Sequence, residues 1–584
     1  MIYSRTVILS IRRSVSHLKF SFRFSSTTSR PIYYEPVSRY ANRVALIDHS
    51  SSYTYGQLYS LSRQLSRRLV PLCQQQKSTD DTSTRHHVQF GILCPNDASF
   101  IVAMWASWMA GATVVPLSSH HPPSSLAYFL TDAQCRGVIV GSDANNELIK
   151  TTLKGNAQID LPIINITKKN LSTASLNEDI SDDLLLTTTN IDRTQRSNAL
   201  IIYTSGTSGK PKGCVLTFDT VQAHVDSMIK AWRWTKDDVI LHVLPLHHVH
   251  GLINALLTPL YIGATILMLP NFDASKAWEH LVHPGFEQHV TVFTAVPTIY
   301  SKLIKDYETK LASRPQTRDF VRDQCSHMIR LMMSGSAALP ESIQQRWYEI
   351  TGHTLLERYG MTECGMALTN PLNGERISGT VGRPMPGVTI RIVKENPSSP
   401  QGYDTLVEAD SDNTKVEASS KEEPIEGELL IQSPTLFKEY WRKRNETRAT
   451  FTADGSFFKT GDICRYIPGK NVFAIRGRQS MDIIKRAGYK ISALDIERVL
   501  LDNKNISECS VVGIDDSTLG QKIVAVVVPK SPNKTDELTT DKIRQYSKQS
   551  LPSYSLPDSV AILEQIPRNA MGKVNKKELA RLIV

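Results

Sequence analysis

The sequence predicts an α/β fold, with a large N-terminal domain of layered sheets and helices followed by a smaller, mobile α+β C-terminal domain. Short apolar runs alternate with amphipathic helical segments over most of the 584 residues. This pattern is typical of parallel sheets covered by helices on both faces. After about residue 478 the alternation gives way to a compact mixture of strands and helices. We therefore expect two domains, at residues 29–478 and 479–584.

The first elements follow directly from local signals. Residues 45–48 are expected to form a strand, and Thr54 and Gln57 have the spacing of a capping box that opens a helix. The apolar stripe of that helix consists of Leu58, Leu61, Leu65 and Leu69. Residues 100–117 are the most apolar stretch and are at the edge of the length that spans a bilayer. Because this stretch follows a short strand and a turn, we expect a buried helix and no membrane span.

Similar units continue along the chain. We expect strands at residues 138–140, 238–244 and 291–295, and helices after Gly251 and from Pro297 to about residue 307. The polar segments 74–87 and 394–426 have the composition of surface excursions. The second is long for a compact domain, so it is predicted to be a mobile insertion.

The C-terminal segment shows different local signals. Ser492 and Asp495 cap a helix that is expected to end near Leu501. The other elements predicted here are strands at residues 508–514, 522–529 and 560–563 and a helix at residues 541–551.

Charge is concentrated at the N-terminus. Lys and Arg outnumber Asp and Glu by ten overall, but residues 1–34 hold six basic residues, eight serines and no acid. The remaining excess of four gives little reason to expect a nucleic-acid partner. A basic, Ser-rich, acid-free leader is typical of a mitochondrial transit peptide, which we place at residues 1–28, with processing near Arg23-Phe24-Ser25. Eight scattered cysteines without a CxxC motif fit reduced thiols, as in the mitochondrial matrix.

A Gly-rich loop carries the first chemical signal. Residues 203–213 read YTSGTSGKPKG and follow the strand-like residues 199–202. Glycines allow backbone N–H groups to approach an anion, while hydroxyls and lysines add donors and positive charge. The segment therefore predicts a polyphosphate-binding loop, and it lacks the Walker A spacing.

The loop resembles that of the adenylate-forming superfamily, which includes acyl-CoA synthetases. Further motifs follow in the order of that family, at Ser334–Leu339, Arg358–Glu363, Thr460–Asp462, Arg476–Arg478 and Pro567–Lys573. The resemblance covers almost everything after the leader, and it implies ATP and coenzyme A as co-substrates and Mg²⁺ as cofactor.

The resemblance also implies roles for individual residues. Those expected around the β- and γ-phosphates are Thr204, Ser205, Gly206, Thr207, Ser208, Gly209, Lys210, Pro211 and Lys212. The adenine pocket would be lined by Gly335, Ser336 and Ala337, with Tyr359 stacked on the base. Thr362 would contact the α-phosphate, Glu363 would hold Mg²⁺, and Asp462 would accept hydrogen bonds from the ribose beside Arg478.

The C-terminal domain would supply the remaining groups. Lys573 would bridge the carboxylate substrate and the α-phosphate. A hinge is expected near Ser480–Asp482, and the residues assigned to the hinge and coenzyme A channel are Met481, Asp482, Gly488 and Tyr489. Ala487 departs from the family's usual Gly-Gly pair, which leaves the path of this loop open.

Two longer runs, residues 237–251 and 350–363, resemble the mitochondrial malonyl-CoA synthetase branch of the family. That resemblance implies a ligase for malonate, and methylmalonate with it. Residues 353–358 are expected to form a strand after a helix that Pro340 opens and Gly352 ends. Arg358 would then lie at a carboxyl end, where α/β sheets bind ligands, and its planar fork suits a second carboxylate. The alternative role is an ion pair with Glu357 or Glu375.

Other functions stay open at this point. A medium-chain acyl-CoA synthetase would need a pocket without a cation, and an inactive nucleotide sensor would be expected to lack Lys573 or Glu363. A carrier-loading adenylation module would need a separate acceptor protein. The cluster His247, His248 and His250 favours pocket lining, led by His248, over a metal site. The sequence indicates no oligomeric state.

Overall fold

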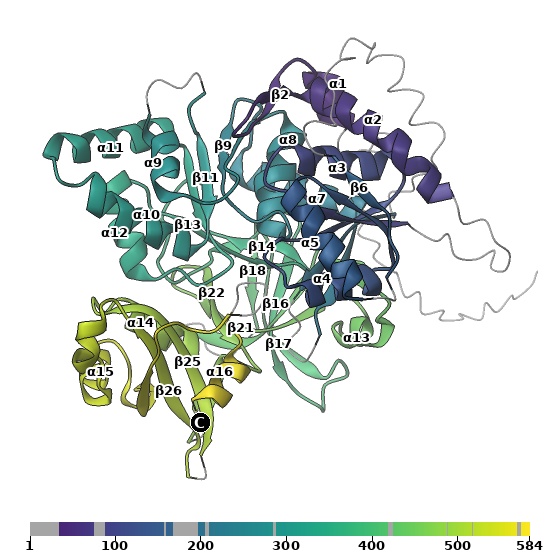
Figure 1. The fold of residues 1–584 in the computed structure, drawn as a ribbon. Helices are drawn as coiled ribbons and strands as arrows, with labels where there is room; N and C mark the ends of the chain where they lie inside the picture. Colours follow the sequence, from purple (N-terminus) through teal and green to yellow (C-terminus); the bar gives the residue numbers. More distant parts are fainter. Residues whose placement is uncertain are drawn as a thin grey trace, which may run out of the picture.

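The computed structural model describes residues 34–74, 88–156, 159–166, 197–204, 210–283, 288–417, 424–487, 489–516, 518–568 and 574–583. It consists of a large N-terminal part and a smaller C-terminal unit, which is yellow-green in Figure 1 and lies below the larger part. The predicted leader and nearly all of the 74–87 segment lie outside the described residues.

The first sheet of the large part is mostly parallel. Within the described residues its nine strands run in the order β15 (Arg383–Pro384), β14 (Gly365–Thr369), β13 (Leu356–Met361), β12 (Leu331–Ser334), β11 (Val292–Ala295), β9 (Val239–His242), β10 (Thr265–Met268), β1 (Val44–Ile47) and β2 (Ser52–Thr54). The helices that belong to this part of the chain are α1 (Tyr34–Tyr40), α7 (Phe218–Trp232), α8 (Thr258–Ile262), α9 (Ala274–Val282), α10 (Pro297–Lys310), α11 (Pro315–Met328) and α12 (Glu341–Thr351). The expected alternation of strands and helices is confirmed here.

A second sheet carries the Gly-rich loop. Its seven described strands run in the order β20 (Glu439–Tyr440), β8 (Lys212–Thr217), β7 (Asn198–Thr204), β4 (Thr113–Pro116), β3 (Gln89–Leu93), β5 (Cys135–Val140) and β6 (Ile163–Asn165). Its helices are α2 (Tyr55–Gln74), α3 (Ala98–Met109), α4 (Pro123–Asp132) and α5 (Asp143–Lys154).

Local signals for α2 are confirmed, whereas those for α3 are confirmed only in part. The Thr54 hydroxyl accepts from the Gln57 N–H at 3.2 Å, and the Gln57 side chain accepts from the Thr54 N–H at 2.9 Å. The apolar stretch at 100–117 is a buried helix only as far as Met109. Gly111, with φ of 82°, turns the chain, so that residues 113–116 form a strand. No helix among the described residues is long and apolar enough to cross a membrane.

The prediction of a mobile insertion at 394–426 was wrong for the described residues of this segment. Described residues of this segment extend an antiparallel sheet with the order β18 (Thr414–Val416), β17 (Tyr403–Ala409), β16 (Thr389–Glu395), β19 (Ile425–Gln432), β21 (Phe458–Ile467) and β22 (Val472–Arg478). Helix α13 (Arg444–Ala449) lies between β20 and β21 in sequence. One face of an antiparallel sheet can remain in water, so its strands carry many polar residues and have the composition of a loop.

The C-terminal unit has its own small sheets and its own core. The strands are β23 (Ile483–Arg486), β24 (Tyr489–Ser492), β25 (Ile506–Asp516), β26 (Gly520–Pro529) and β27 (Ser559–Ile562). The helical segments are α14 (Ala493–Leu501), η3 (Pro532–Leu538), α15 (Thr540–Ser547), η4 (Ser553–Ser555) and α16 (Lys576–Leu582). The predicted cap is confirmed, since the Ser492 hydroxyl accepts from the Asp495 N–H at 3.2 Å. Strand β22 ends at Arg478 and β23 starts a different sheet, while the boundary at 478/479 stays a prediction.

Candidate functional site

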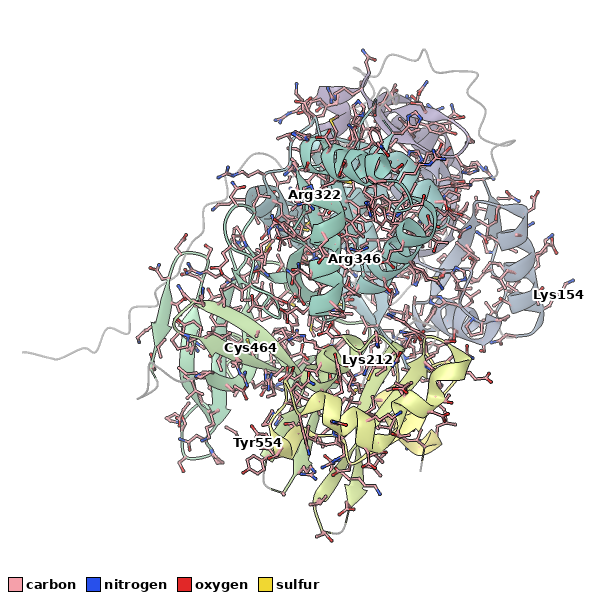
Figure 2. All side chains as sticks on the ribbon, turned by 90° about the vertical axis from the view of Figure 1, so that its left-hand side faces the viewer. Lys154, Lys212, Arg322, Arg346, Cys464 and Tyr554 are labelled. Carbon is pink, nitrogen blue, oxygen red and sulfur yellow. The ribbon has the colours of Figure 1, made fainter. Side chains whose placement is uncertain are left out.

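Strands β7 and β8 hold the two ends of the phosphate-loop candidate. They pair antiparallel as far as Thr204 and Lys212, and the predicted phosphate-binding residues Ser205–Gly209 lie outside the described residues. The Lys212 ammonium, labelled in Figure 2, lies 5.1 Å from the centre of the Tyr440 ring. Lys210 lies in the same way 5.6 Å from the ring of Tyr128. Aromatic faces therefore hold both lysines at the end of the loop.

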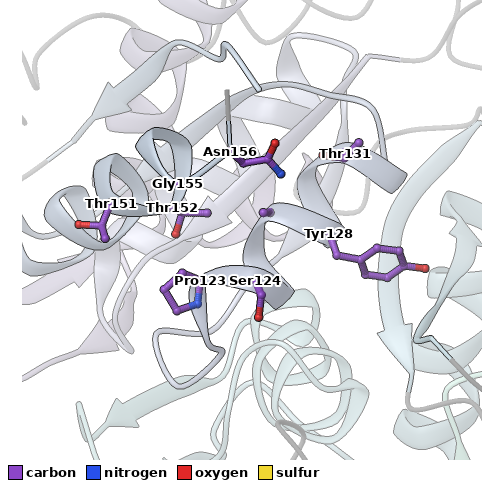
Figure 3. Close-up of a pocket in the computed structure, with 9 residues that line it drawn as sticks. Pro123, Ser124, Tyr128, Thr131, Thr151, Thr152, Gly155 and Asn156 are labelled. Atoms are coloured by element: carbon purple, nitrogen blue, oxygen red, sulfur yellow. The ribbon is translucent and has the colours of Figure 1, made fainter. Parts of the chain in front are cut away.

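Tyr128 also fixes the backbone of this loop. It comes from α4, and its hydroxyl donates to the carbonyl of Pro211 at 2.8 Å. A pocket of about 450 Å³ lies beside it, between α4 and α5, and is lined mainly by hydroxyl and apolar groups (Figure 3). Among the described residues that line this pocket there is no Asp, Glu, Lys, Arg or His.

The predicted ribose-binding pair lies together. Asp462 on β21 is directly opposite Arg478 on β22, and the Arg478 Nε lies 3.3 Å from Asp462 Oδ1. The Tyr359 hydroxyl donates to Asp462 Oδ2 at 2.5 Å. Burial raises the pKa of Asp462, and the nearby Arg478 opposes this effect. The expectation that Arg478 lies beside Asp462 is confirmed, and Tyr359 joins them from β13.

Glu363 lies on the turn between β13 and β14. Its side chain is buried, and its Oε1 accepts from the Tyr440 hydroxyl at 2.9 Å. In the described part of the chain, Glu363 Oε2 has no hydrogen-bond partner. Thr362, which precedes it on the turn, is partly exposed. Among the described residues, no three His, Cys, Asp or Glu side chains gather into a metal-binding group. A Mg²⁺ ion at Glu363 would therefore be bound by this carboxylate together with phosphate oxygens of the substrate, which is usual for this ion.

The adenine-pocket candidate lies at the carboxyl end of β12. Gly335 is buried, and Ser336 and Ala337 are exposed. Ser336 has a φ of 67°, which is uncommon for a residue with a side chain. His250 lies within hydrogen-bond distance of Ser336 Oγ at 3.1 Å and of Thr294 Oγ1 at 2.8 Å. His250 therefore anchors this strained turn to β11.

His250 begins an unusual helix. The helix expected after Gly251 is the π-helix η2 (His250–Leu257), which continues directly into α8. Such wide turns occur often at functional sites. Burial lowers the pKa of His250 well below its usual range, and the nearby Arg358 adds to this effect. His250 is thus a neutral ring beside a buried cation. His248, which we expected to lead this cluster, is partly exposed, with its ring 4.1 Å from that of His247.

Arg358 is the main candidate residue on the acyl side of the site, where the acid substrate is expected to bind. It lies on β13, where the parallel pairing with β12 has just ended at Ser334 and Glu357. The strand begins and ends three residues later than predicted, at 356–361 and not at 353–358. Arg358 still lies at the carboxyl end of the parallel pairing with β12. The side chain is 3% exposed, and its guanidinium lies against the backbone of Gly335.

The Arg358 guanidinium is incompletely bonded. Among the described residues, neither Nε nor Nη2 has a hydrogen-bond partner. Burial lowers the pKa of Arg358 to about 10, and the nearby Tyr300 opposes this effect. A buried cation without a counter-ion is costly, so an anionic ligand would stabilise this arrangement.

The alternative ion pairs for Arg358 were wrong. Neighbouring residues of a strand point to opposite faces, so Glu357 faces away from Arg358. The Glu357 carboxylate instead accepts from the Leu339 N–H at 3.1 Å, and the charge that lowers its pKa is that of Arg498 on α14. Glu375 is exposed and lies 3.4 Å from Lys470.

The expected hinge residues connect the two parts of the molecule. The Arg478 N–H donates to Asp482 Oδ2 at 2.9 Å, and Lys576 on α16 lies 2.6 Å from Asp482 Oδ1. Lys576 also lies 2.6 Å from Glu497 Oε1. Met481 is partly exposed next to this group. Lys573 and Gly488 lie outside the described residues, so their roles stay predictions.

Tyr489, expected near the coenzyme A channel, is 52% exposed. Its ring stacks on that of Tyr554, with centroids 4.4 Å apart and planes inclined by 5°. Two stacked, exposed rings offer an aromatic surface on the C-terminal unit.

Several residues of the site were missed by sequence reasoning. Tyr440 and Tyr128 contact the predicted groups from segments far away in the chain, and no local motif marks them. Tyr554 also lacked a signal. His250 was noticed only as a member of a cluster, and its spacing could not reveal that it contacts Ser336.

Solved structures of similar fold include ATP-bound MatB from Rhodopseudomonas palustris, with a TM-score of 0.74, 25% identity, and coverage of 94% of this chain and 98% of that chain. A malonyl-CoA ligase in a ternary product complex with methylmalonyl-CoA and AMP gives a TM-score of 0.57 at 29% identity, covering 90% of this chain and 97% of that one.

Curated relatives include the mitochondrial malonate–CoA ligases of Bos taurus and Homo sapiens. The bovine protein is 45% identical over 95% of this chain and 91% of its own length. The human protein is 42% identical over 95% of this chain and 92% of its own length.

Family comparison agrees with the geometry of the site. Residues 34–441 match the family described as AMP-binding enzyme, and residues 495–573 match the AMP-binding enzyme C-terminal domain. Because the first match alone spans well over half of the chain, the protein belongs to the AMP-binding enzyme family.

Proposed function

We propose that the protein is an AMP-forming malonate–CoA ligase. The observation that carries this proposal is Arg358, a buried guanidinium with two nitrogens that lack partners among the described residues. A dicarboxylic acid brings a second carboxylate that can bind such a fork while its first carboxylate reacts with ATP. The malonate–CoA ligases among the relatives support the same substrate.

In the first half-reaction a carboxylate oxygen of malonate attacks the α-phosphorus of ATP, the bond to the β-phosphate oxygen breaks, and pyrophosphate leaves. The residues between Thr204 and Lys212 would hold the β- and γ-phosphates. Asp462, supported by Arg478, would accept from the ribose hydroxyls, and Tyr359 would lie along the base. These groups orient ATP so that reaction becomes effectively intramolecular.

Glu363 fits a Mg²⁺ ion, since it is a hard carboxylate ligand with one oxygen free of partners within the described residues. Bound there with ATP, the ion would supply positive charge to the phosphate oxygens. Thr362 would contact the α-phosphate, and Lys573 would bring a further positive charge to it from the C-terminal unit.

In the second half-reaction the coenzyme A thiol attacks the carbonyl carbon of the malonyl-adenylate and AMP leaves. We infer that the C-terminal unit turns about Met481 and Asp482 between the two steps, which would keep water from the adenylate. The exposed Tyr489–Tyr554 stack and the loop at Gly488 would then line the coenzyme A channel.

We further place the protein in the mitochondrial matrix, with residues 1–28 removed as a transit peptide. The acid-free leader and the mitochondrial relatives support this location. The mature protein should begin between about Phe24 and Arg30, and an intact Met1 in protein purified from mitochondria would contradict it.

A panel of carboxylic acids tests the substrate. Pyrophosphate release should be measured with the purified chain and ATP, using malonate, methylmalonate, butyrate and octanoate. We expect kcat/KM for malonate to exceed that for butyrate by at least about 10²-fold, because a site built around a polar partner rejects analogues that lack it. A preference for octanoate would favour a medium-chain synthetase, and the absence of release with every acid would contradict the proposed function.

A further inference from the structure

Tyr440 lies between two groups of opposite charge that belong to different motifs. Its ring faces the Lys212 ammonium at 5.1 Å, and its hydroxyl donates to Glu363 Oε1 at 2.9 Å. Tyr440 is 6% exposed and Glu363 is 9% exposed. One side chain therefore contacts both the end of the phosphate-loop candidate and the candidate Mg²⁺ ligand.

The backbone around Tyr440 fixes this position from both sides. On one side, β20 pairs with β8 through Tyr440 and Cys214, and the Trp441 N–H donates to the Gly213 carbonyl at 2.7 Å. On the other side, the Phe437 N–H donates to the Glu363 carbonyl at 2.8 Å. These hydrogen bonds hold the segment that carries Tyr440 against both β8 and the turn of Glu363.

We propose that Tyr440 is a positioning residue that keeps Lys212 and Glu363 apart and available for MgATP. In the described part of the chain no ion pair joins the two residues, although Lys212 lies over the Tyr440 ring and Glu363 accepts from the Tyr440 hydroxyl. The hydroxyl occupies one oxygen of Glu363, which fixes the carboxylate and leaves the other oxygen for the metal. The ring holds the ammonium by a cation–π contact, which ties Lys212 to no carboxylate and leaves N–H donors for phosphate oxygens.

A role in packing alone would explain the ring but not the hydroxyl. Tyr440 packs against Phe437 with ring centroids 4.8 Å apart, and phenylalanine would preserve that contact. Partners that orient a metal ligand typically change metal affinity about 10- to 100-fold when they are removed. The hydroxyl should therefore act on Mg²⁺ dependence rather than on stability.

The inference rests on the proposed ATP-dependent function, and the test measures binding as well as turnover. ATP affinity should be determined by calorimetry in saturating Mg²⁺ and in EDTA, without any acid substrate. For Tyr440→Phe we expect the gain in ATP affinity from Mg²⁺ to shrink about tenfold, with affinity in EDTA unchanged. Tyr440→Leu should also weaken ATP binding in EDTA, because Lys212 loses its ring. The matched control is Tyr466→Phe, whose hydroxyl donates to Asn471 at 3.1 Å, and it should behave as wild type.

A double-mutant cycle separates positioning from packing. If Tyr440 acts through Glu363, adding Tyr440→Phe to Glu363→Gln should reduce the Mg²⁺ effect no further, whereas independent effects would add. Wild-type Mg²⁺ dependence in Tyr440→Phe would overturn the inference. Should Tyr440→Leu fail to fold, Tyr440→Phe decides alone. A wild-type chain that binds ATP but releases no pyrophosphate with any acid would contradict the proposed function and leave the result on Tyr440 standing.

Discussion

The nucleotide side and the acyl side of the candidate site differ in how their charges are satisfied. On the nucleotide side, Asp462 has Arg478 and Tyr359, and Glu363 has Tyr440. On the acyl side, Arg358 is buried with two guanidinium nitrogens that have no partner among the described residues. The charged groups of the first side are bonded to one another, whereas an anionic ligand, as in the proposed function, would balance the charge of the second. The difference indicates which side selects the substrate.

Changes on the nucleotide side should affect every acid substrate equally. Asp462→Ala removes the expected acceptor for two ribose hydroxyls and the partner of Arg478. Hydrogen bonds to charged groups are worth about 1.5–3 kcal/mol each, so the two lost bonds should lower kcat/KM for ATP by the equivalent of about 3–6 kcal/mol.

Pyrophosphate release checks this prediction, and the loss should be the same with malonate and with butyrate. Asp454→Ala, which removes a carboxylate bonded to Ser456 and Thr452 in a nearby turn, is the matched control. A loss confined to malonate would erase the distinction between the two sides.

A second prediction concerns Glu357, the acid next to Arg358 in sequence. Burial raises the pKa of Glu357 from 4.5 to about 7, with Arg498 opposing. The folded state therefore holds the proton more tightly, so this contribution to stability is complete below about pH 4.5 and is lost as the pH rises through about 7. At 1.36 kcal/mol per pKa unit the loss is about 3 kcal/mol by pH 8.

Glu357→Gln is neutral at every pH and should flatten that profile, which denaturant unfolding between pH 5 and 8 would measure. If Glu357 were instead paired with Arg358, its pKa would be lowered and the wild type would gain stability over the acid part of this range. A wild-type stability that rises with pH would therefore indicate that Arg358 is paired with Glu357, and it would contradict the contrast between the two sides.

The smallest expected effect lies in the C-terminal unit. Ala487 has a φ of 47°, a left-handed conformation that costs about 1 kcal/mol or more for a residue with a side chain. Ala487→Gly should therefore stabilise the unit by up to about 1 kcal/mol. Asn471→Gly, at a φ of 52° in the large part, should change stability by less, because asparagine tolerates this conformation. Equal gains at both positions in thermal unfolding would contradict the argument.

Short sequence patterns were sufficient to predict much of the fold. The capping residues Thr54 and Ser492 are three positions from their partners, and Gly352 ends α12 with a φ of 79°. Because the atoms involved are close in sequence, their types and spacing predict the contact. The adjacency of Asp462 and Arg478 was expected from the family resemblance alone, and the pairing of β21 with β22 places the two residues opposite each other.

Contacts between distant segments could not be predicted in this way. Tyr440 is 77 positions from Glu363, and the two meet only through tertiary contacts, among them the hydrogen bond from the Phe437 N–H to the Glu363 carbonyl. The strands within 394–426 were missed because their exposed faces are polar. The unpaired state of Arg358 also depends on the three-dimensional structure, since the sequence offered two acids as partners and the strand directs one of them to the opposite face.

The most direct test of the central claim is the ratio of kcat/KM for malonate to that for butyrate, in wild type and in Arg358→Leu. We expect the variant to lose about 3–5 kcal/mol for malonate, roughly 10²- to 10⁴-fold, and far less for butyrate. Arg358→Lys should restore only part of the loss, since an ammonium lacks the planar fork. If malonate and butyrate fell by the same factor, Arg358 would be a structural residue and the assignment of a dicarboxylate substrate to this side would be contradicted.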